Sequence, residues 1–405
     1  MRKNLRENYS PLYFLSALGS GGLAISFFMY LMFMVKHPGR PMANFEHVYP
    51  VLMGDNRFIS ITVGIALLGI LFFSYKHFRL LFWNLREYRL YKKTEAYAKL
   101  KQSNGEVSLM AIPLTLGMTI NVLFIVAGVF VPNLWDIVEY LFPFALLAYF
   151  LTGFYTLAIF KSYFTRFIKN GDFDFVSNNN LSQMLAVFAL SMVAVGFAAP
   201  AAMSHTLAVS MIATVMAIFF GSFALMLMML KMALGFKSIF KHGIDKAGSP
   251  SLWMVIPILT LLGITIVRLY AGLNHNLLHN PEPAALPLFI PLTVFVSIQV
   301  MFGLIGYSVL KNINYFSDMI HGEEKSPGSF SLICPGVAFF VLGMFFIHWG
   351  FVKTGIVTQF SAVYFAMLVP FVIVQLKSIT TIFKLNKKLF SLPKKTRSVS
   401  VNKAV

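Results

Sequence analysis

The sequence predicts an all-α integral membrane protein in which ten transmembrane helices form five helical hairpins, with the odd-numbered helices inside and the even-numbered helices outside. Three observations predict this fold class: the composition, the apolar runs and the placement of the basic residues. Hydrophobic residues make up 58% of the 405 residues and charged residues only 12%, whereas about a quarter of the residues of a soluble globular protein are charged. A lipid bilayer is therefore the expected surrounding of most of the chain.

The apolar runs give the number of helices. A helix needs about 20 mostly apolar residues to cross a bilayer, and ten runs in the sequence reach that length. They cover about residues 12–35, 58–83, 107–131, 135–160, 181–201, 205–236, 251–272, 285–310, 328–352 and 357–383. We expect these spans to form one domain over residues 1–390, followed by a basic cytoplasmic tail over residues 391–405.

The basic residues give the orientation. The net charge is +18, and all but five of the 33 Lys and Arg residues belong to the N-terminal segment, the loops after even-numbered spans or the C-terminal tail. The five exceptions are Lys36, Arg40, Arg57, Arg268 and Lys353. By the positive-inside rule both termini are cytoplasmic, and we expect a multi-pass protein of a cell inner (plasma) membrane. Basic residues spread over short loops are unlike the basic face of a nucleic-acid-binding domain, so we expect no nucleic-acid partner.

The loops also suggest how the spans pair. The links after odd-numbered spans, such as VPNLWD (131–136) and KTG (353–355), are mostly short, which predicts five hairpins of consecutive spans. The longest basic loop is LREYRLYKKTEAYAKLK (85–101). It is compatible with an amphipathic helix on the anionic inner leaflet, and equally with a solvated helix extension that only fixes topology.

Three odd-numbered spans share a local pattern. SLMAIPLTLG (108–117), SLWMVIPILTLLG (251–263) and SFSLICPGVAFFVLG (329–343) each carry a serine, then a proline, then a glycine, while spans 1 and 5 carry glycines at comparable depth. The positions at which we expect kinked or softened helices are Gly19, Gly22, Pro113, Gly196 and Pro257. Proline frees a backbone carbonyl, which in lipid must be buried in protein or face water. The recurrence favours five inner helices around a common axis over the alternative that these residues are ordinary in membrane helices.

The remaining polar residues suggest little chemistry. Arg268, near the outer end of span 7, would either draw anions into an outer vestibule or extend to the lipid headgroups. His275 and His279 are four residues apart, but no third metal ligand accompanies them apart from Glu282, so we expect an ordinary outer loop and no metal. The sequence has no hydrolase triad and no nucleotide-binding motif. We therefore expect a protein that is not an enzyme and that has no cofactor.

Three stretches resemble a known family. YFLSALGSGG (13–22), VSLMAIP (107–113) and SFSLICPGVA (329–338) are similar to the first, third and ninth helices of the tellurite-resistance/dicarboxylate transporters, which include TehA-like proteins and the slow-type anion channels of plant guard cells. The resemblance implies ten helices in five hairpins around a central pore in each subunit, a phenylalanine that plugs this pore, and a homotrimer. It implies a passive channel or uniporter for small anions such as chloride or nitrate. A coupled carrier of dicarboxylates or tellurite-like oxyanions is the alternative within the same class.

The ninth span departs from the family pattern. Where TehA-like proteins have an aromatic–polar–aromatic–glycine run, this chain has Ile333, Cys334, Pro335 and Gly336, so that the gate phenylalanine is missing and Phe339 or Phe340 would substitute for it. We expect these six residues to form the pore constriction. Cys334 is the single cysteine, and three interpretations stay open: a small apolar filler beside a kink, part of the constriction, or a reactive thiol. The last would make the chain a membrane thiol redox protein, and a non-conducting structural or sensory relative is a further alternative.

Overall fold

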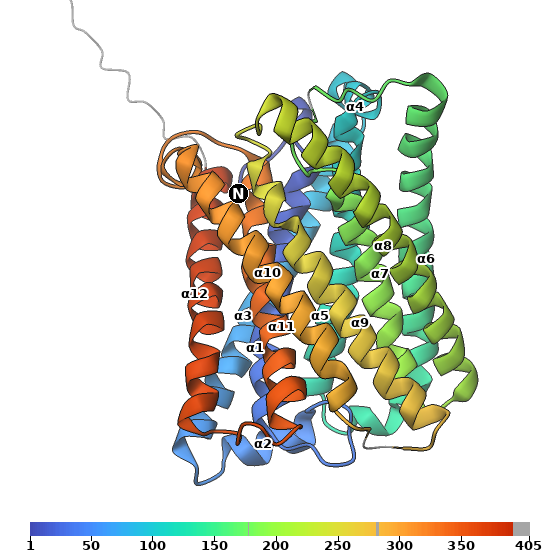
Figure 1. Ribbon diagram of the computed structural model, residues 1–405, viewed down its shortest axis with the longest axis vertical. Helices are drawn as coiled ribbons and strands as arrows, with labels where there is room; N and C mark the ends of the chain where they lie inside the picture. Colours follow the sequence, from blue (N-terminus) through green and yellow to red (C-terminus); the bar gives the residue numbers. More distant parts are fainter. Residues whose placement is uncertain (177, 281–282, 392–405) are drawn as a thin grey trace, which may run out of the picture.

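The computed structural model describes residues 1–176, 178–280 and 283–391, and the secondary structure of this part of the chain is entirely helical (Figure 1). Ten segments are long and apolar enough to cross a membrane, so the chain is a multi-pass membrane protein. Their helices are α1 (Phe14–Met34), α3 (Arg57–Tyr91), α5 (Ala111–Phe130), α6 (Leu134–Asn170), α7 (Met184–Met203), α8 (Leu207–His242), α9 (Val255–Asn276), α10 (Leu286–Asn312), α11 (Ile333–Phe345) and α12 (Ala362–Phe390).

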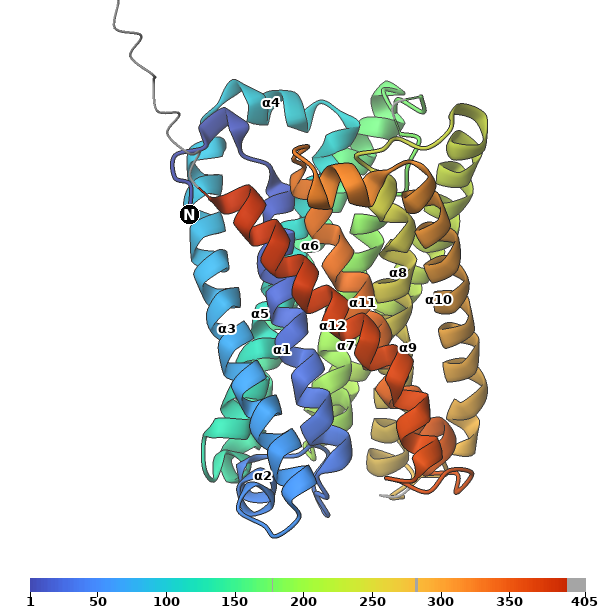
Figure 2. The ribbon, with the colours of Figure 1, turned by 90° about the vertical axis from the view of Figure 1, so that its left-hand side faces the viewer.

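Two short helices mark the two ends of the molecule. Helix α4 (Glu95–Lys101) lies at the end where the chain begins, and α2 (Phe45–Leu52) lies at the opposite end (Figures 1 and 2). The basic loop expected at 85–101 is divided in two, because α3 continues to Tyr91 and α4 starts anew after Thr94, whose hydroxyl accepts a hydrogen bond from the Tyr97 amide at 3.4 Å. Of the predicted tail, residues 392–405 lie outside the described part of the chain.

The prolines that recur in three of the predicted inner spans lie where the helix changes type. Short 3₁₀ segments precede α1, α5, α9 and α11, and Pro113, Pro257 and Pro335 are the third residues of α5, α9 and α11. The first four amides of an α-helix have no partner within it, so proline costs little at this position. The prolines thus mark the junctions between 3₁₀ and α-helix, whereas the sequence suggested kinks inside longer helices.

The odd-numbered spans are the buried ones. In their most apolar windows 56% to 94% of the residues are buried, against 28% to 39% in the even-numbered spans. Helix α1 contacts α5, α5 contacts α7, α7 contacts α9, α9 contacts α11, and α11 contacts α1 again. These five helices therefore form a closed inner ring. Helices α3, α6, α8, α10 and α12 each pack against the odd-numbered span that precedes them. Their outer faces expose large apolar side chains, such as Leu68 and Phe154, as contact with lipid requires.

The N-terminal segment is bound to the α4 end of this bundle. The buried Glu87 of α3 accepts hydrogen bonds from the backbone amides of Asn4 and Leu5 at 3.1 and 2.8 Å. The Trp83 indole donates to the Arg2 carbonyl at 2.7 Å, and the Arg2 amide donates to the carbonyl of Phe390 in α12. A buried carboxylate is satisfied here by backbone amides, and the two ends of the described chain therefore lie together.

Candidate functional site

A cavity of about 250 Å³ lies inside the inner ring, and all five inner helices line it. Its lining residues nearest the α4 end are Leu18, Met118, Phe188, Pro257 and Cys334. Its lining residues nearest the α2 end are Met32, Ile125, Met203, Ala271 and Trp349. The cavity thus runs along the axis of the ring from the first turns of most inner helices to the α2 end, where Pro41 and Met42 of the α1–α2 loop also contribute.

Arg268 of α9 is the one charged side chain among the residues that line the cavity. Its Nη1 donates a hydrogen bond to the carbonyl of Val195 in α7 at 3.0 Å. Among the described residues it makes no salt bridge, although a guanidinium has five N–H donors. An unpaired cation in a cavity of low dielectric is unfavourable, so this site attracts negative charge.

A hydrogen-bonded group lies on the same wall of the cavity as Arg268. The Tyr149 hydroxyl of α6 donates to Asn121 Oδ1 at 2.9 Å and also lies 3.2 Å from the carbonyl of Gly117. Among the described residues, the Asn121 amide nitrogen has only the sulfur of Met192 as its acceptor, at 3.6 Å. Since a thioether is a weak acceptor, this amide remains available as a donor to a ligand.

The glycine at 196 explains how Tyr149 reaches this wall from an outer helix. A Cβ atom on Gly196 would lie 1.9 Å from Tyr149 Cε1, a distance that no real contact allows. Gly196 lines the cavity as expected from the sequence, and its missing side chain makes room for the tyrosine ring. The residue therefore has a packing role in addition to any effect on helix flexibility.

The mouth of the cavity at the α2 end carries a second positive charge. The Lys353 ammonium lies over the ring of Trp349, 3.8 Å from its centroid, and this tryptophan lines the cavity. Nearby, the ring of His37 in the α1–α2 loop is 6.2 Å from the ring of His47 in α2, and burial lowers the pKa of His37 below its usual value. The mouth thus adds the lysine charge to that of Arg268.

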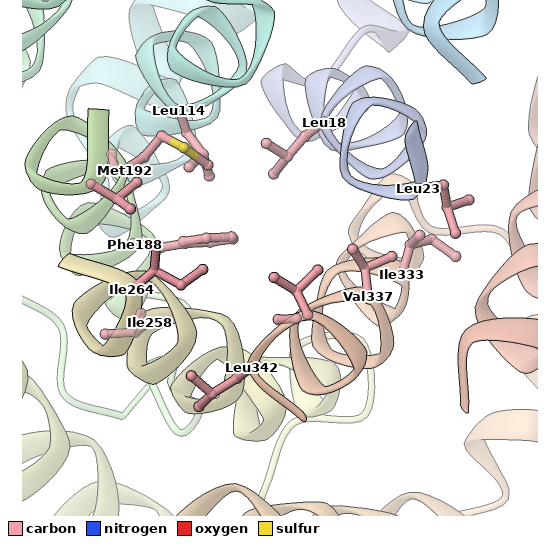
Figure 3. Close-up of a cluster of buried hydrophobic side chains, with 14 of the residues drawn as sticks. Leu18, Leu23, Leu114, Phe188, Met192, Ile258, Ile264, Ile333, Val337 and Leu342 are labelled. Carbon is pink, nitrogen blue, oxygen red and sulfur yellow. The ribbon is translucent and has the colours of Figure 1, made fainter. Parts of the chain in front are cut away.

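Phe188 projects across the inner end of the cavity. Figure 3 shows its ring directed from α7 into the central space, with Leu18, Leu114 and Met192 arranged around the same space. Phe188 is almost completely buried, so the neighbouring side chains leave little room around it. Sequence reasoning missed this residue because it sought the aromatic gate in span 9, although Phe188 is one of only two aromatic residues of α7.

The structure separates the six residues predicted for the constriction. Cys334 lines the cavity and is half-buried. The other five, Ile333, Pro335, Gly336, Phe339 and Phe340, are not among its lining residues. The sequence interpretation placed the narrow point on one stretch of α11, whereas the cavity has walls from all five inner helices.

The neighbours of these five residues explain their positions. Ile333 packs against α1, where a Cβ on Gly19 would lie 2.9 Å from its Cγ2. A Cβ on Gly336 would meet the Ser378 hydroxyl of α12. The Phe339 ring also faces α12, since its centroid is 4.7 Å from that of Phe371.

Phe340 is fully buried and its ring centroid lies 5.3 Å from that of Tyr30. Pro335 is buried as well. Neither phenylalanine is therefore placed to close the cavity, and both contribute to packing between α11 and its neighbours.

The predicted helix-softening residues divide in the same way. Gly19, Gly22 and Pro257 line the cavity, together with Gly196, whereas Pro113 does not. A Cβ on Gly22 would lie 3.1 Å from Val337 Cγ1, so the two glycines of α1 allow close packing against α11. Of the described residues no three His, Cys, Asp or Glu side chains are grouped as a metal site, and Glu282, the suggested third ligand, lies outside those residues.

Comparison of the chain with protein-family models, with curated proteins and with solved structures finds no match. The chemistry of the cavity is therefore the basis on which a function is proposed.

Proposed function

We propose that the protein is a passive anion channel or uniporter whose pathway runs through the cavity of the inner ring. The observation that carries the proposal is Arg268, the single charged residue of the lining, which among the described residues has a backbone carbonyl and no carboxylate as its partner. A pathway for anions through lipid needs positive potential and hydrogen-bond donors without a site that traps the ion. One guanidinium and the Asn121 amide supply these.

The composition of the lining supports passive conduction over proton-coupled transport. No Asp, Glu or His is among the lining residues, whereas proton-coupled carriers place such groups in relays along the pathway. The lining contains a single thiol as well, Cys334, and the chain has no second cysteine. A redox role would need a partner from another molecule.

Phe188 is the proposed gate. Its ring lies at the inner end of the cavity, where an ion would have to pass between it and Leu18. This replaces the gate expected at Phe339 or Phe340. An aromatic plug from α7 in place of α11 closes the same central space, because both helices belong to the inner ring.

The wider resemblance is part of the proposal. We propose membership of the tellurite-resistance/dicarboxylate transporter family, with five hairpins around the pore, a homotrimeric assembly and an inner (plasma) membrane location. The distribution of basic residues supports a cytoplasmic α4 end, in which case the cavity extends toward the outside. The fold supports the hairpins through the packing of each even-numbered span on the preceding odd-numbered span.

The test is chloride and nitrate flux into proteoliposomes. We expect the wild type to conduct and Phe188→Ala to increase the flux. Arg268→Gln should reduce the flux by about tenfold or more, because one buried charge contributes more than about 1.4 kcal/mol to the free energy of binding an anion. Two matched controls should leave the flux unchanged: Arg57→Gln, an exposed arginine at the start of α3, and Phe339→Ala, which faces α12. If the wild type and Phe188→Ala both show no flux for either anion, the channel proposal is wrong.

A further inference from the structure

We propose that the cavity binds monovalent organic anions with an apolar body, such as medium-chain carboxylates, in preference to dicarboxylates and to small inorganic anions. This inference rests on the proposed function, because it names the ligand class of the same cavity. Three features of the lining carry it: the position of the two donors, the chemistry of the remaining walls and the restriction of charge among the lining residues to Arg268, since Lys353 lies at the mouth over the Trp349 ring.

The two donors lie next to each other on one wall. Arg268 donates to the carbonyl of Val195 and Asn121 donates to the sulfur of Met192, so both donors contact the same part of α7, within about one helical turn. Tyr149 lines the same cavity, and its hydroxyl donates to Asn121 Oδ1. A guanidinium beside an amide matches the two oxygens of one carboxylate.

The opposite wall is apolar apart from the Cys334 thiol at its inner end, and it carries no charged group. Helices α1 and α11 line it with Ile25, Met29, Val337, Val341 and Phe345. A cavity of about 250 Å³ is far larger than one ion, and water against these side chains would be unfavourable. An alkyl or aryl group attached to the carboxylate would cover the apolar wall and remove its surface from water.

A second carboxylate inside the cavity would find no counter-charge, because the other nearby cation, Lys353, lies at the mouth and is not among the lining residues. Arg268 is the one charge of the lining, and an ionised group that is buried without a counter-charge is strongly disfavoured. This separates two ligands of equal length: hexanoate places a methyl group where adipate places its second carboxylate. The cavity chemistry therefore argues against the dicarboxylates suggested as an alternative cargo.

The experiment measures binding of radiolabelled hexanoate to the purified protein in nanodiscs at neutral pH, with displacement by unlabelled acetate, butyrate, hexanoate, adipate and chloride. Each added methylene should lower the displacing concentration about fourfold, since each buried methylene contributes about 0.8 kcal/mol. Hexanoate should thus displace the label at concentrations on the order of 100-fold lower than acetate. Adipate should be weaker than hexanoate by a similar factor. A displacing concentration that is the same for all carboxylates, or lower for adipate, overturns the inference.

Variants localise the binding to this cavity. Arg268→Gln should weaken hexanoate at least tenfold, whereas Arg57→Gln, the same change at an exposed position, should not alter it. If Arg268→Gln does not fold, Arg268→Lys keeps the charge and should retain the preference for hexanoate over adipate. Hexanoate binding that is unchanged in Arg268→Gln contradicts the proposed site.

The flux experiment and the binding experiment test the proposed function and the ligand class separately. Chloride flux that Arg268→Gln abolishes, together with equal binding of hexanoate and adipate, would overturn the ligand class and leave the anion pathway standing. No flux of any anion, together with tight hexanoate binding that needs Arg268, would overturn the channel and support the ligand class.

Discussion

At the scale of one residue, Cys334 offers a site at which access to the cavity can be measured. It is the only cysteine of the chain, it is the second residue of α11, and it lines the inner end of the cavity. Its sequence neighbours Ile333 and Pro335 are buried away from the cavity. Cys334 and Phe188 both line the cavity, so modification of the thiol reports whether a reagent from the α2 end reaches the inner end of the cavity.

We predict that a membrane-impermeant anionic thiol reagent, sulfonatoethyl methanethiosulfonate, modifies Cys334 faster than its cationic trimethylammonium analogue. Arg268 lies on the route to the thiol, and one unit charge at about 10 Å and an effective dielectric constant of about 20 contributes roughly 1.7 kcal/mol, which corresponds to more than a tenfold change in rate. The rates are measured by mass spectrometry on protein in nanodiscs.

Two variants control this measurement. Cys334→Ser should show no modification, and Arg268→Gln should remove most of the difference between the two reagents. Equal rates for both reagents in the wild type would mean that Arg268 does not set the potential in the cavity.

At the scale of the elements, the sequence determined where the spans lie but not which way their side chains point. The ten predicted spans are confirmed as ten apolar helices, because span length and hydrophobicity are local properties. Which side of α11 faces the cavity cannot be determined from its own residues. All residues of ICPGVAFFVLGMF are apolar or small, so the helix has no polar face that would indicate a direction. At 3.6 residues per turn, Cys334, Val337, Val341 and Phe345 share the face that lines the cavity, whereas Phe339 points elsewhere.

Phe188 illustrates the same limit on α7. In the most apolar window of its span 94% of the residues are buried, so periodicity separates neither a lipid face nor a cavity face. Only the closure of the ring by α1 and α11 shows that Phe188 projects into a central space. Contacts between distant parts of the chain therefore decided which aromatic residue lies on the axis.

We predict that Gly196→Ala destabilises the protein. The new Cβ would lie 1.9 Å from a ring atom of Tyr149, so the ring or the backbone of α7 must shift, and such overpacking typically costs about 1–3 kcal/mol. The thermal unfolding midpoint in detergent should fall accordingly. Displacement of Tyr149 should also weaken anion binding, because its hydroxyl orients Asn121.

The control is Gly221→Ala on α8. Its Cβ would meet only the Ala194 Cβ at 3.8 Å, an ordinary contact, and alanine is the better helix former by about 1 kcal/mol. Gly221→Ala should leave the unfolding midpoint unchanged or raise it. An unchanged midpoint in Gly196→Ala would show that α7 and α6 can separate without loss, and the tight packing would then have no energetic weight.

At the scale of the whole molecule, most basic residues lie at one end of the bundle, and the cavity extends to the other end. The α4 end carries most basic residues and binds the N-terminal segment through Glu87 and Trp83. The cavity extends to the α2 end, where Lys353 and Arg268 supply its positive potential. The positive-inside rule places the α4 end in the cytoplasm and therefore predicts that the cavity opens on the outer side of the membrane.

This orientation leads to the last prediction, which is simple to test because the chain has only one native cysteine to remove. In a Cys334→Ser background, Asp55→Cys places a thiol in the exposed loop at the α2 end and Lys93→Cys places one in the exposed loop at the α4 end. An impermeant maleimide added to intact spheroplasts should label Asp55→Cys at once and should label Lys93→Cys only after the membrane is permeabilised. Both positions are exposed turns outside the spans, so a difference in labelling reports sidedness and not burial. Labelling in the reverse order would place the cavity mouth in the cytoplasm, and the pathway would then load anions from inside the cell.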